Sequence, residues 1–372
     1  MKIEVMIYVY LAICVGMILF NIVSAVLSRS REKSLLKTSR GFEERILEEL
    51  THCEECGDVS DEHQAYLTKK LRHMGNMRAF DIALEREYAN NPELVKKYLS
   101  CLSCVFVSLA IRNGGKDDIE AAYFPYIIKK YRILHGRPFD AMLDVMYLLL
   151  HKPSIYCREN AMQAIYTVGE PACVIKALKI ADDQPRFYHN KLLTDGLLNF
   201  EGSTEKLSEA LWENFEEFSS HMQMIVLNYF RFSSGDHCEK ILRLMIDESR
   251  DDEIRFTCIR YFGKYRFDRA YPYLLRYADG KTDARWEYAA IASSVLCLYP
   301  SDETVEVLKS NLYNHNWYIR FNASQSLERM GLTYLDLIDI VEGKDRFASE
   351  ILRYRFNVRD IMEEEKEMSA VC

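Results

Sequence analysis

The second half of the chain repeats one pattern about every thirty-two residues. Each repeat starts at a position that we call the rung residue: Arg158, Lys191, Gln223, Arg255, Trp286 and Arg320. Three residues after the rung residue, in repeat order, the chain has Ala161, Thr194, Val226, Cys258, Ala289 and Ala323. Seven residues after it come Ile165, Leu198, Phe230, Phe262, Ser293 and Leu327. Eleven residues after it come Gly169, Gly202, Ser234, Arg266, Cys297 and Gly331. Offsets of three and seven bury one helix face, and a small residue at eleven ends the helix. This self-similarity predicts stacked helical pairs, an α-solenoid, rather than a globular enzyme fold.

A second helix is expected after the residue at offset eleven in every repeat. These helices are predicted at residues 171–181, 205–215, 238–248, 270–277, 304–312 and 334–341. Each pair is too small to bury its apolar face alone, so neighbouring pairs must complete the core. No segment has the alternating pattern of a strand, and the chain is therefore predicted to be all-α.

The region before the repeats predicts shorter and less regular helices. We expect them at residues 41–50, 61–88, 92–112, 118–134 and 139–151, with Asn113 and the following two glycines as a turn. The predicted organisation has five parts: a membrane anchor at 1–28, a basic linker at 29–41, capping helical hairpins at 42–152, repeats at 153–345, and a C-terminal helix with an acidic tail at 346–372.

The anchor prediction depends on an uncharged run from Val5 to Leu27. A helix of this length spans about 35 Å, which is enough to cross a bilayer, whereas a cleaved signal peptide has a shorter apolar core. Basic residues follow the run and only Lys2 precedes it; the later ones are Arg29, Arg31, Lys33, Lys37 and Arg40. Because such residues stay on the cytoplasmic side, we expect a single-pass protein of the cell membrane, with its N-terminus outside and its repeats in the cytoplasm.

Charge and cysteine content limit the function further. Forty-eight basic residues against 56 acidic ones give a net charge of -8, which disfavours nucleic acid as a partner. The 11 cysteines lack the spacing of a disulfide scaffold, and we interpret them as reduced thiols in a cytosolic compartment.

The repeat resembles the short form of the HEAT repeat, known from phycobilin lyases and many bacterial proteins. The resemblance lies in Arg320, Ala323, Leu327 and Gly331, and in Arg158, Ala161, Ile165 and Gly169. It covers residues 153–345 and implies a right-handed α-solenoid, while the Trp, Leu-Gly and Tyr signature of tetratricopeptide repeats does not recur. Gln223 and Trp286 depart from the basic rung position, and Arg266 replaces the glycine.

No motif predicts an enzyme. The diiron hydroxylases of this repeat class use His-Glu dipeptides, and no histidine here precedes glutamate. A nucleophile elbow, a phosphate loop and an HExxH zinc motif are also missing from the sequence. Cys53 and Cys56 form a CxxC without a second knuckle, so we predict no metal and no cofactor. The acidic pairs at 182–183 and 251–252 are interpreted as helix N-caps.

If the family geometry holds, the rung helices line a concave face that binds a protein partner. The residues predicted to contact it are Asn228, Tyr229, Arg260, Tyr261, Lys264, Tyr288, Asn322, Gln325 and Arg329. Tyrosine, arginine and asparagine are common in recognition surfaces, although the tyrosines could instead fill the seams between helices.

The sequence therefore favours a membrane-tethered scaffold that binds a protein. Two alternatives stay open: an accessory subunit of an integral membrane enzyme such as a polysaccharide-synthesising glycosyltransferase, and a lyase-like ligand carrier.

Overall fold

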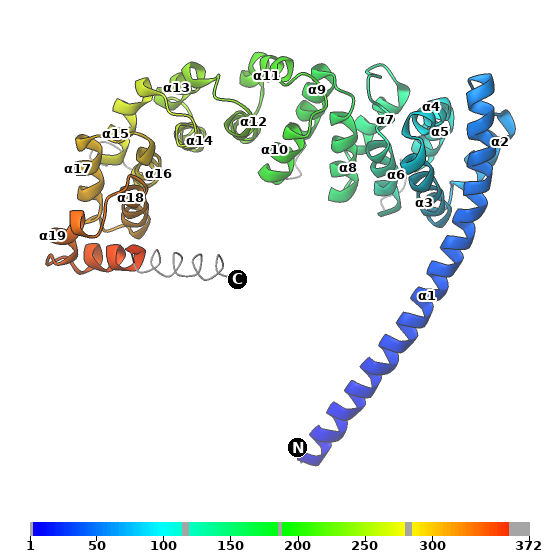
Figure 1. The fold of residues 1–372 in the computed structure, drawn as a ribbon, viewed down its shortest axis with the longest axis horizontal. Helices are drawn as coiled ribbons and strands as arrows, with labels where there is room; N and C mark the ends of the chain where they lie inside the picture. The colour runs from blue at the N-terminus through cyan, green and yellow to red at the C-terminus, as the bar shows by residue number, and fades with distance from the viewer. Residues whose placement is uncertain (1–2, 114–118, 185–187, 280–284, 357–372) are drawn as a thin grey trace. The chain divides into compact units, whose positions relative to one another are not determined.

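The computed structural model describes residues 3–113, 119–184, 188–279 and 285–356. Within these ranges all regular secondary structure is helical, as predicted, and no strand occurs (Figure 1). The chain forms two compact units, which we describe separately. Unit 1 contains residues 1–184 and 200–204, and unit 2 contains residues 185–199 and 205–372.

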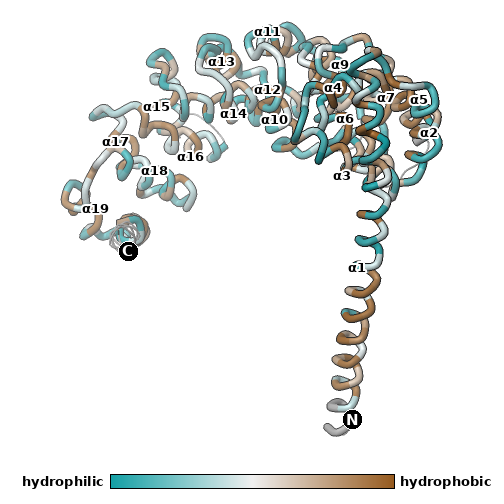
Figure 2. Tube along the Cα trace, turned by 45° about the vertical axis from the view of Figure 1, so that its right-hand side comes forward, coloured by the Kyte–Doolittle hydropathy of each residue, from teal (hydrophilic) through white to brown (hydrophobic). Residues whose placement is uncertain are grey.

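Helix α1 (Ile3–Cys56) begins unit 1 and is one continuous helix of 54 residues. The segment predicted as a basic linker at 29–41 is therefore helical, and the prediction of a separate helix at 41–50 is wrong. The segment contains no proline, and Gly41 costs a helix interior only about 1 kcal/mol. From Tyr8 to Leu27 the apolar side chains point into solvent, and none of that stretch is buried. Figure 2 shows this apolar part of α1 and the more polar part that follows it.

The other helices of unit 1 are α2 (Asp61–Lys70), α3 (Met74–Asn90), α4 (Pro92–Cys101), α5 (Ser103–Asn113), α6 (Ile119–Lys130), α7 (Ala141–Leu149), α8 (Ile155–Tyr166) and α9 (Pro171–Asp182). Helices α4 and α5 replace one predicted helix, because the chain bends by 61° at Leu102. The last part of α1 packs against α3 and α4, whereas α6 packs on α8. The predicted glycine turn lies partly outside the described residues.

A buried carboxylate joins two helices of unit 1. Asp81 on α3 accepts hydrogen bonds from the hydroxyls of Tyr123 and Tyr131, each at 2.7 Å, and from the Lys130 amine at 2.9 Å. All three donors belong to α6 or to the turn after it. Burial and the nearby Asp81 raise the pKa of Tyr131, so the hydroxyl remains a donor at neutral pH. We assign this cluster a structural role, because every oxygen of the carboxylate has a partner.

The remaining helices belong to unit 2, except that Thr204, the first residue of α11, is counted in unit 1. They are α10 (Asn190–Leu198), α11 (Thr204–Glu213), α12 (Ser220–Ser233), α13 (Cys238–Ile246), α14 (Asp252–Phe262), α15 (Tyr271–Asp279), α16 (Trp286–Val295), α17 (Asp302–Asn311), α18 (Trp317–Arg329) and α19 (Ile338–Val341). Residues 346–356 form a further helix. The rung helices are α8, α10, α12, α14, α16 and α18, each at its predicted place. The second helices also match the predicted segments, with α19 preceded by a 3-10 turn.

Packing in unit 2 follows the chain order. Each rung helix contacts the next one, from α10 through α12, α14 and α16 to α18, and α13, α15 and α17 each pack on the rung helix that follows. All six residues at offset three are buried. At offset seven Leu198 is the exception at 42% exposure, because Leu197 faces the core in that helix. Small residues allow close approach, as where Ala289 and Ala290 meet Ile319.

Candidate functional site

Four of the six rung residues are buried, and three of them tie their helix to the segment just before it. Arg158 Nη1 donates to the carbonyls of Lys152 and Pro153, at 2.9 and 2.7 Å. Arg320 Nη1 makes the same pair of bonds to Asn314 and His315, and Gln223 Nε2 bonds Phe215 and Phe218. The rung position therefore satisfies loop carbonyls, which explains why glutamine can replace arginine there.

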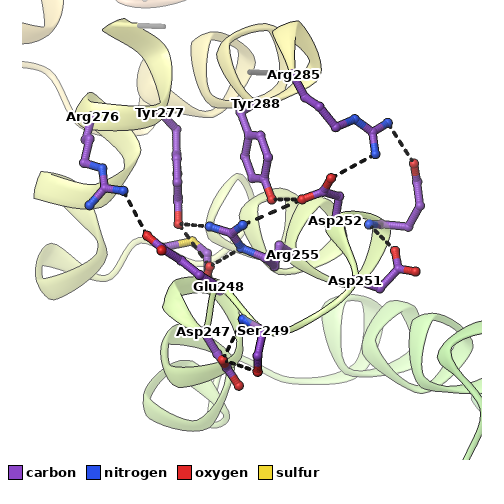
Figure 3. A network of polar contacts seen from close by, with 12 residues as sticks. Asp247, Glu248, Ser249, Asp251, Asp252, Arg255, Arg276, Tyr277, Arg285 and Tyr288 are labelled. Atoms are coloured by element: carbon purple, nitrogen blue, oxygen red, sulfur yellow. Dashed lines mark hydrogen bonds and ion pairs between the residues drawn. The ribbon is translucent and has the colours of Figure 1, made fainter. Parts of the chain in front are cut away.

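The fourth buried rung residue, Arg255, is the centre of a polar network (Figure 3). Its Nε donates to the Met245 carbonyl at 3.1 Å and its Nη2 to the Tyr277 hydroxyl at 3.1 Å. Nη1 lies 3.7 Å from Asp252, and the guanidinium lies 4.8 Å from the ring centre of Tyr288. The network joins α13, α14, α15 and α16, so it fixes the packing of two consecutive repeats.

Asp252 connects that network to the surface. The Tyr288 hydroxyl donates to Asp252 Oδ1 at 2.5 Å, and Arg285 Nη1 donates to Oδ2 at 3.1 Å. The hydrogen bond from Tyr288, together with Arg285, holds the pKa of Asp252 below its usual range. Asp251 Oδ1 accepts from the Glu253 amide at 2.8 Å, which confirms it as an N-cap. Asp182 and Asp183 instead lie at the C-terminal end of α9, so that N-cap prediction is wrong.

The three tyrosines predicted to face a partner are buried, which corrects their assignment. Tyr229, Tyr261 and Tyr288 each expose 2% of their surface or less. The Tyr261 hydroxyl donates to the Ser234 carbonyl at 2.9 Å, and Tyr288 bonds Asp252 as described above. These side chains fill seams between helices. Tyr229 and Tyr261 lie at offset six, which is close to the buried face of a 3.6-residue helix, whereas Tyr288 lies at offset two.

Three predicted residues remain at least partly exposed, namely Asn228 on α12, Arg260 on α14 and Lys264 in the turn after α14. The structure adds Arg231 and Phe232 beside them. The Lys264 amine donates to the Phe232 carbonyl at 3.4 Å and lies 5.4 Å from the centre of the Phe232 ring. Arg231 lies over the same ring at 5.3 Å. We call Asn228, Arg231, Phe232, Arg260 and Lys264 the cationic patch.

The two arginines of the cationic patch are half-buried. Burial lowers the pKa of both, and for Arg260 the neighbouring charge of Arg231 lowers it further, whereas Glu253 opposes the shift. In the part of the chain that the structure describes, no carboxylate forms an ion pair with either guanidinium, and Arg231 Nε is buried without a hydrogen-bond partner. A cation held away from water without a counterion is unfavourable, so an incoming carboxylate would be attracted to this patch.

The predicted residues on α18 have different surroundings. The Asn322 side-chain nitrogen donates to the Ala290 carbonyl on α16 at 2.8 Å. Gln325 is half-exposed and Arg329 is exposed. The structure does not connect these three to the cationic patch, so the predicted face divides into separate parts.

An exposed aromatic cluster near the predicted face was missed. Trp286 begins α16, and its ring stacks on that of Tyr318 with centres 5.5 Å apart. Trp317 lies 5.2 Å from Tyr318, and all three side chains are about half exposed. The adjacent Trp317 and Tyr318 at a helix start were the available signal, since adjacent helical positions cannot both point into the core.

The two cysteines of the CxxC face different environments. Cys53 is fully buried and Cys56 is exposed. Burial raises the pKa of the Cys101 thiol, and the neighbouring Cys53 raises it further, which is the opposite of an activated nucleophile. Within the described residues, no group of three or more His, Cys, Asp or Glu side chains has the arrangement of a metal site.

The fold and these sites define a class: an all-helical protein with one long apolar helix and a cationic patch on neighbouring rung helices. The sequence matches no protein-family model and no curated protein.

Proposed function

We propose that this protein is a membrane-tethered scaffold that binds an acidic segment of a protein partner through the cationic patch. In this proposal α1 crosses the membrane with residues 5–27, and the helical pairs form a right-handed, HEAT-like solenoid in the cytoplasm. The observation that carries the binding function is the pair of half-buried arginines, Arg231 and Arg260, which lack carboxylate partners among the described residues.

The patch has the composition of a protein-binding surface. Arginine forks recognise carboxylates with two parallel hydrogen bonds, and the exposed Phe232 ring adds apolar contact between the charges. Asn228 offers an amide at the edge of the patch, although its nitrogen already donates to the Met224 carbonyl at 2.9 Å. Three cations in a chain of net charge -8 are too few to track a nucleic-acid backbone.

The exposed apolar surface of α1 supports the proposed membrane tether. Tyr8, Leu11, Ile18 and Phe20 each expose more than half of their surface, in a stretch of α1 that no other described residue covers. An exposed apolar surface of this extent is unfavourable in water and favourable in lipid. Confinement to the membrane raises the effective concentration of the patch near membrane partners. An integral membrane enzyme is therefore the partner class that we propose first.

Binding can be tested with purified full-length protein in mild detergent. A fluorescent peptide of alternating Glu and Leu should bind, and a Lys and Leu peptide of equal length should not. Arg231→Gln with Arg260→Gln should lower the affinity for the acidic peptide by about tenfold or more, since each lost charge-assisted bond is worth about 1.5–3 kcal/mol. Equal binding by this double variant would remove the patch from the proposal.

A matched control changes two other arginines. Arg269 and Arg276 are exposed and pair with Glu239 and Glu248. Arg269→Gln with Arg276→Gln removes the same charge from the same unit and should leave peptide affinity within about twofold. Co-purification with the wild type and both double variants then identifies the natural partner. Recovery of no integral membrane protein in the wild-type sample would contradict the membrane-enzyme version.

A further inference from the structure

A pocket of about 820 Å³ lies where α1 meets the start of α3. Helix α1 contributes Ser28, Arg31, Glu32 and Thr38 to its lining, and α3 contributes Gly75 and Arg78. Both helices belong to unit 1 and pack directly against each other. The pocket therefore joins the region just after the apolar stretch to the folded helices of the unit.

Because α1 is one continuous helix, the position of the pocket relative to a membrane can be measured along that helix. The apolar stretch ends at Leu27, and the first lining residue is Ser28. At 1.5 Å per residue, Arg31 lies about 6 Å beyond Leu27 along the helix. The polar headgroup layer on each side of a bilayer is about 5–8 Å thick. When α1 crosses a membrane, Arg31 is therefore at the depth of the lipid phosphates.

The charge of the pocket suits an anion. In the described residues no carboxylate forms an ion pair with Arg31 or Arg78, and Glu32 is the one acidic residue in the lining. The first turn of α3 contains no acidic residue. A Cβ added at Gly75 would meet no atom within 4 Å, so the backbone there is open to a ligand. The other basic residues of the segment raise the local positive potential.

We propose that this pocket binds the phosphate group of an anionic membrane lipid. Arg31 and Arg78 hold the phosphate oxygens from two helices, while the hydroxyl of Ser28 adds a hydrogen bond at the membrane side. Two guanidinium forks from separate elements fix a phosphate more specifically than a row of flexible lysines does. The inference rests on the proposed membrane tether, and it adds a lipid that would fix unit 1 at the membrane surface.

The test uses the full-length protein in a neutral detergent, with thermal melting as the readout. Phosphatidylglycerol is titrated into the micelles, and phosphatidylcholine serves as the neutral reference. We expect phosphatidylglycerol to raise the melting temperature of the wild type well above the effect of phosphatidylcholine. Arg31→Gln with Arg78→Gln should weaken the apparent affinity for phosphatidylglycerol by about tenfold or more.

The control variant is Lys33→Gln with Lys37→Gln. These lysines belong to the same basic segment of α1 but do not line the pocket. The control should keep the wild-type response to phosphatidylglycerol. Equal weakening in both double variants would indicate a diffuse attraction and overturn the pocket assignment, as would an equal response to both lipids. Circular dichroism without lipid checks that the variant Arg31→Gln with Arg78→Gln is folded. A second variant, Arg31→Lys with Arg78→Lys, keeps both charges and should retain part of the rise in melting temperature with phosphatidylglycerol.

Two further measurements separate lipid binding from capture of a soluble phosphate and from the tether itself. Glycerol 3-phosphate without its acyl chains should bind much more weakly than the lipid; an equal affinity would assign the pocket to a soluble phosphate ester instead. Both arginine substitutions leave residues 8–27 unchanged, so the variant should remain in membranes after carbonate washing. A wild type that stays in membranes but responds equally to both lipids would end this inference alone, whereas loss of the wild type from membranes would end the proposed tether.

Discussion

The Asn322 side-chain amide donates to the backbone carbonyl of Ala290, at 2.8 Å, and so connects one rung helix to the one before it. Asn160 makes the equivalent bond in unit 1, to the Ala122 carbonyl on α6 at 2.9 Å. Both asparagines lie two residues after a rung arginine. A position that the repeat pattern alone places on the open face is thus used to join neighbouring helices, which leaves less of that face for a partner.

Removing the Arg255 guanidinium should strongly destabilise unit 2. Arg255→Met keeps much of the apolar stem but removes the guanidinium that donates to the Met245 carbonyl and the Tyr277 hydroxyl and that lies beside Asp252. Loss of a hydrogen-bonding partner costs about 1–3 kcal/mol for each buried group that loses it. Arg269→Met, at an exposed ion pair, should cost less than about 1 kcal/mol. Thermal melting, monitored by circular dichroism, measures the stability of both variants. Similar melting temperatures for the two would show that the network does not stabilise the unit.

The contribution of Asp252 should disappear in acid. Its folded-state pKa is lowered, mainly by the Tyr288 hydrogen bond, so the ionised carboxylate stabilises the fold above the unfolded value of 3.8. That stability is lost as the pH falls through the lower, folded-state pKa. The melting temperature of wild type should therefore exceed that of Asp252→Asn at about pH 6, and the difference should shrink towards about pH 3. A difference that stays constant with pH would contradict this linkage.

The sequence predicts the helices well and the surface poorly, for a physical reason. Burial at offsets three and seven follows from helix geometry, so residues such as Cys258 and Leu327 are correctly placed in the core. Exposure at other offsets depends on neighbouring helices, which the repeat pattern does not describe. Tyr261 on α14 is buried, and its hydroxyl donates to the Ser234 carbonyl at the end of α12, whereas Phe232 is exposed despite its apolar ring. Neither contact can be inferred from one helix alone.

The glycines at offset eleven should differ in their sensitivity to substitution. Gly331 has a φ of 89° with no atom within 4 Å of an added Cβ, so Gly331→Ala introduces only backbone strain of about 1–2 kcal/mol. A Cβ on Gly202 would lie 2.2 Å from the Gly169 carbonyl oxygen and 2.5 Å from the Phe200 ring. Gly202→Ala must therefore shift the backbone and should lower the melting temperature more. The reverse order would mean that the two turns do not pack as described.

Replacing Arg260 with an uncharged residue should lower the affinity for the acidic peptide without lowering the stability of the fold. Arg260→Met removes a half-buried charge that has no carboxylate partner among the described residues, while keeping the apolar stem in place. Because the desolvation of that charge is then avoided, the melting temperature should stay equal or rise by a few degrees. Affinity for the acidic peptide should nevertheless fall. A fall in both quantities would indicate that Arg260 holds the fold together rather than a partner.

Charges placed in the apolar part of α1 should release the protein from membranes without unfolding it. Val15 and Leu19 lie in the middle of the stretch and are about half exposed, so Val15→Arg with Leu19→Arg removes no packing from unit 1. Each arginine near the centre of a span opposes insertion by about 2.5–3.5 kcal/mol. After carbonate washing this variant should be soluble, while Leu148→Arg, at an exposed apolar position on α7, should stay with the membrane. Because both changes leave the buried contacts of unit 1 intact, their melting temperatures should agree, and membrane retention of the double variant would show that α1 does not act as the tether.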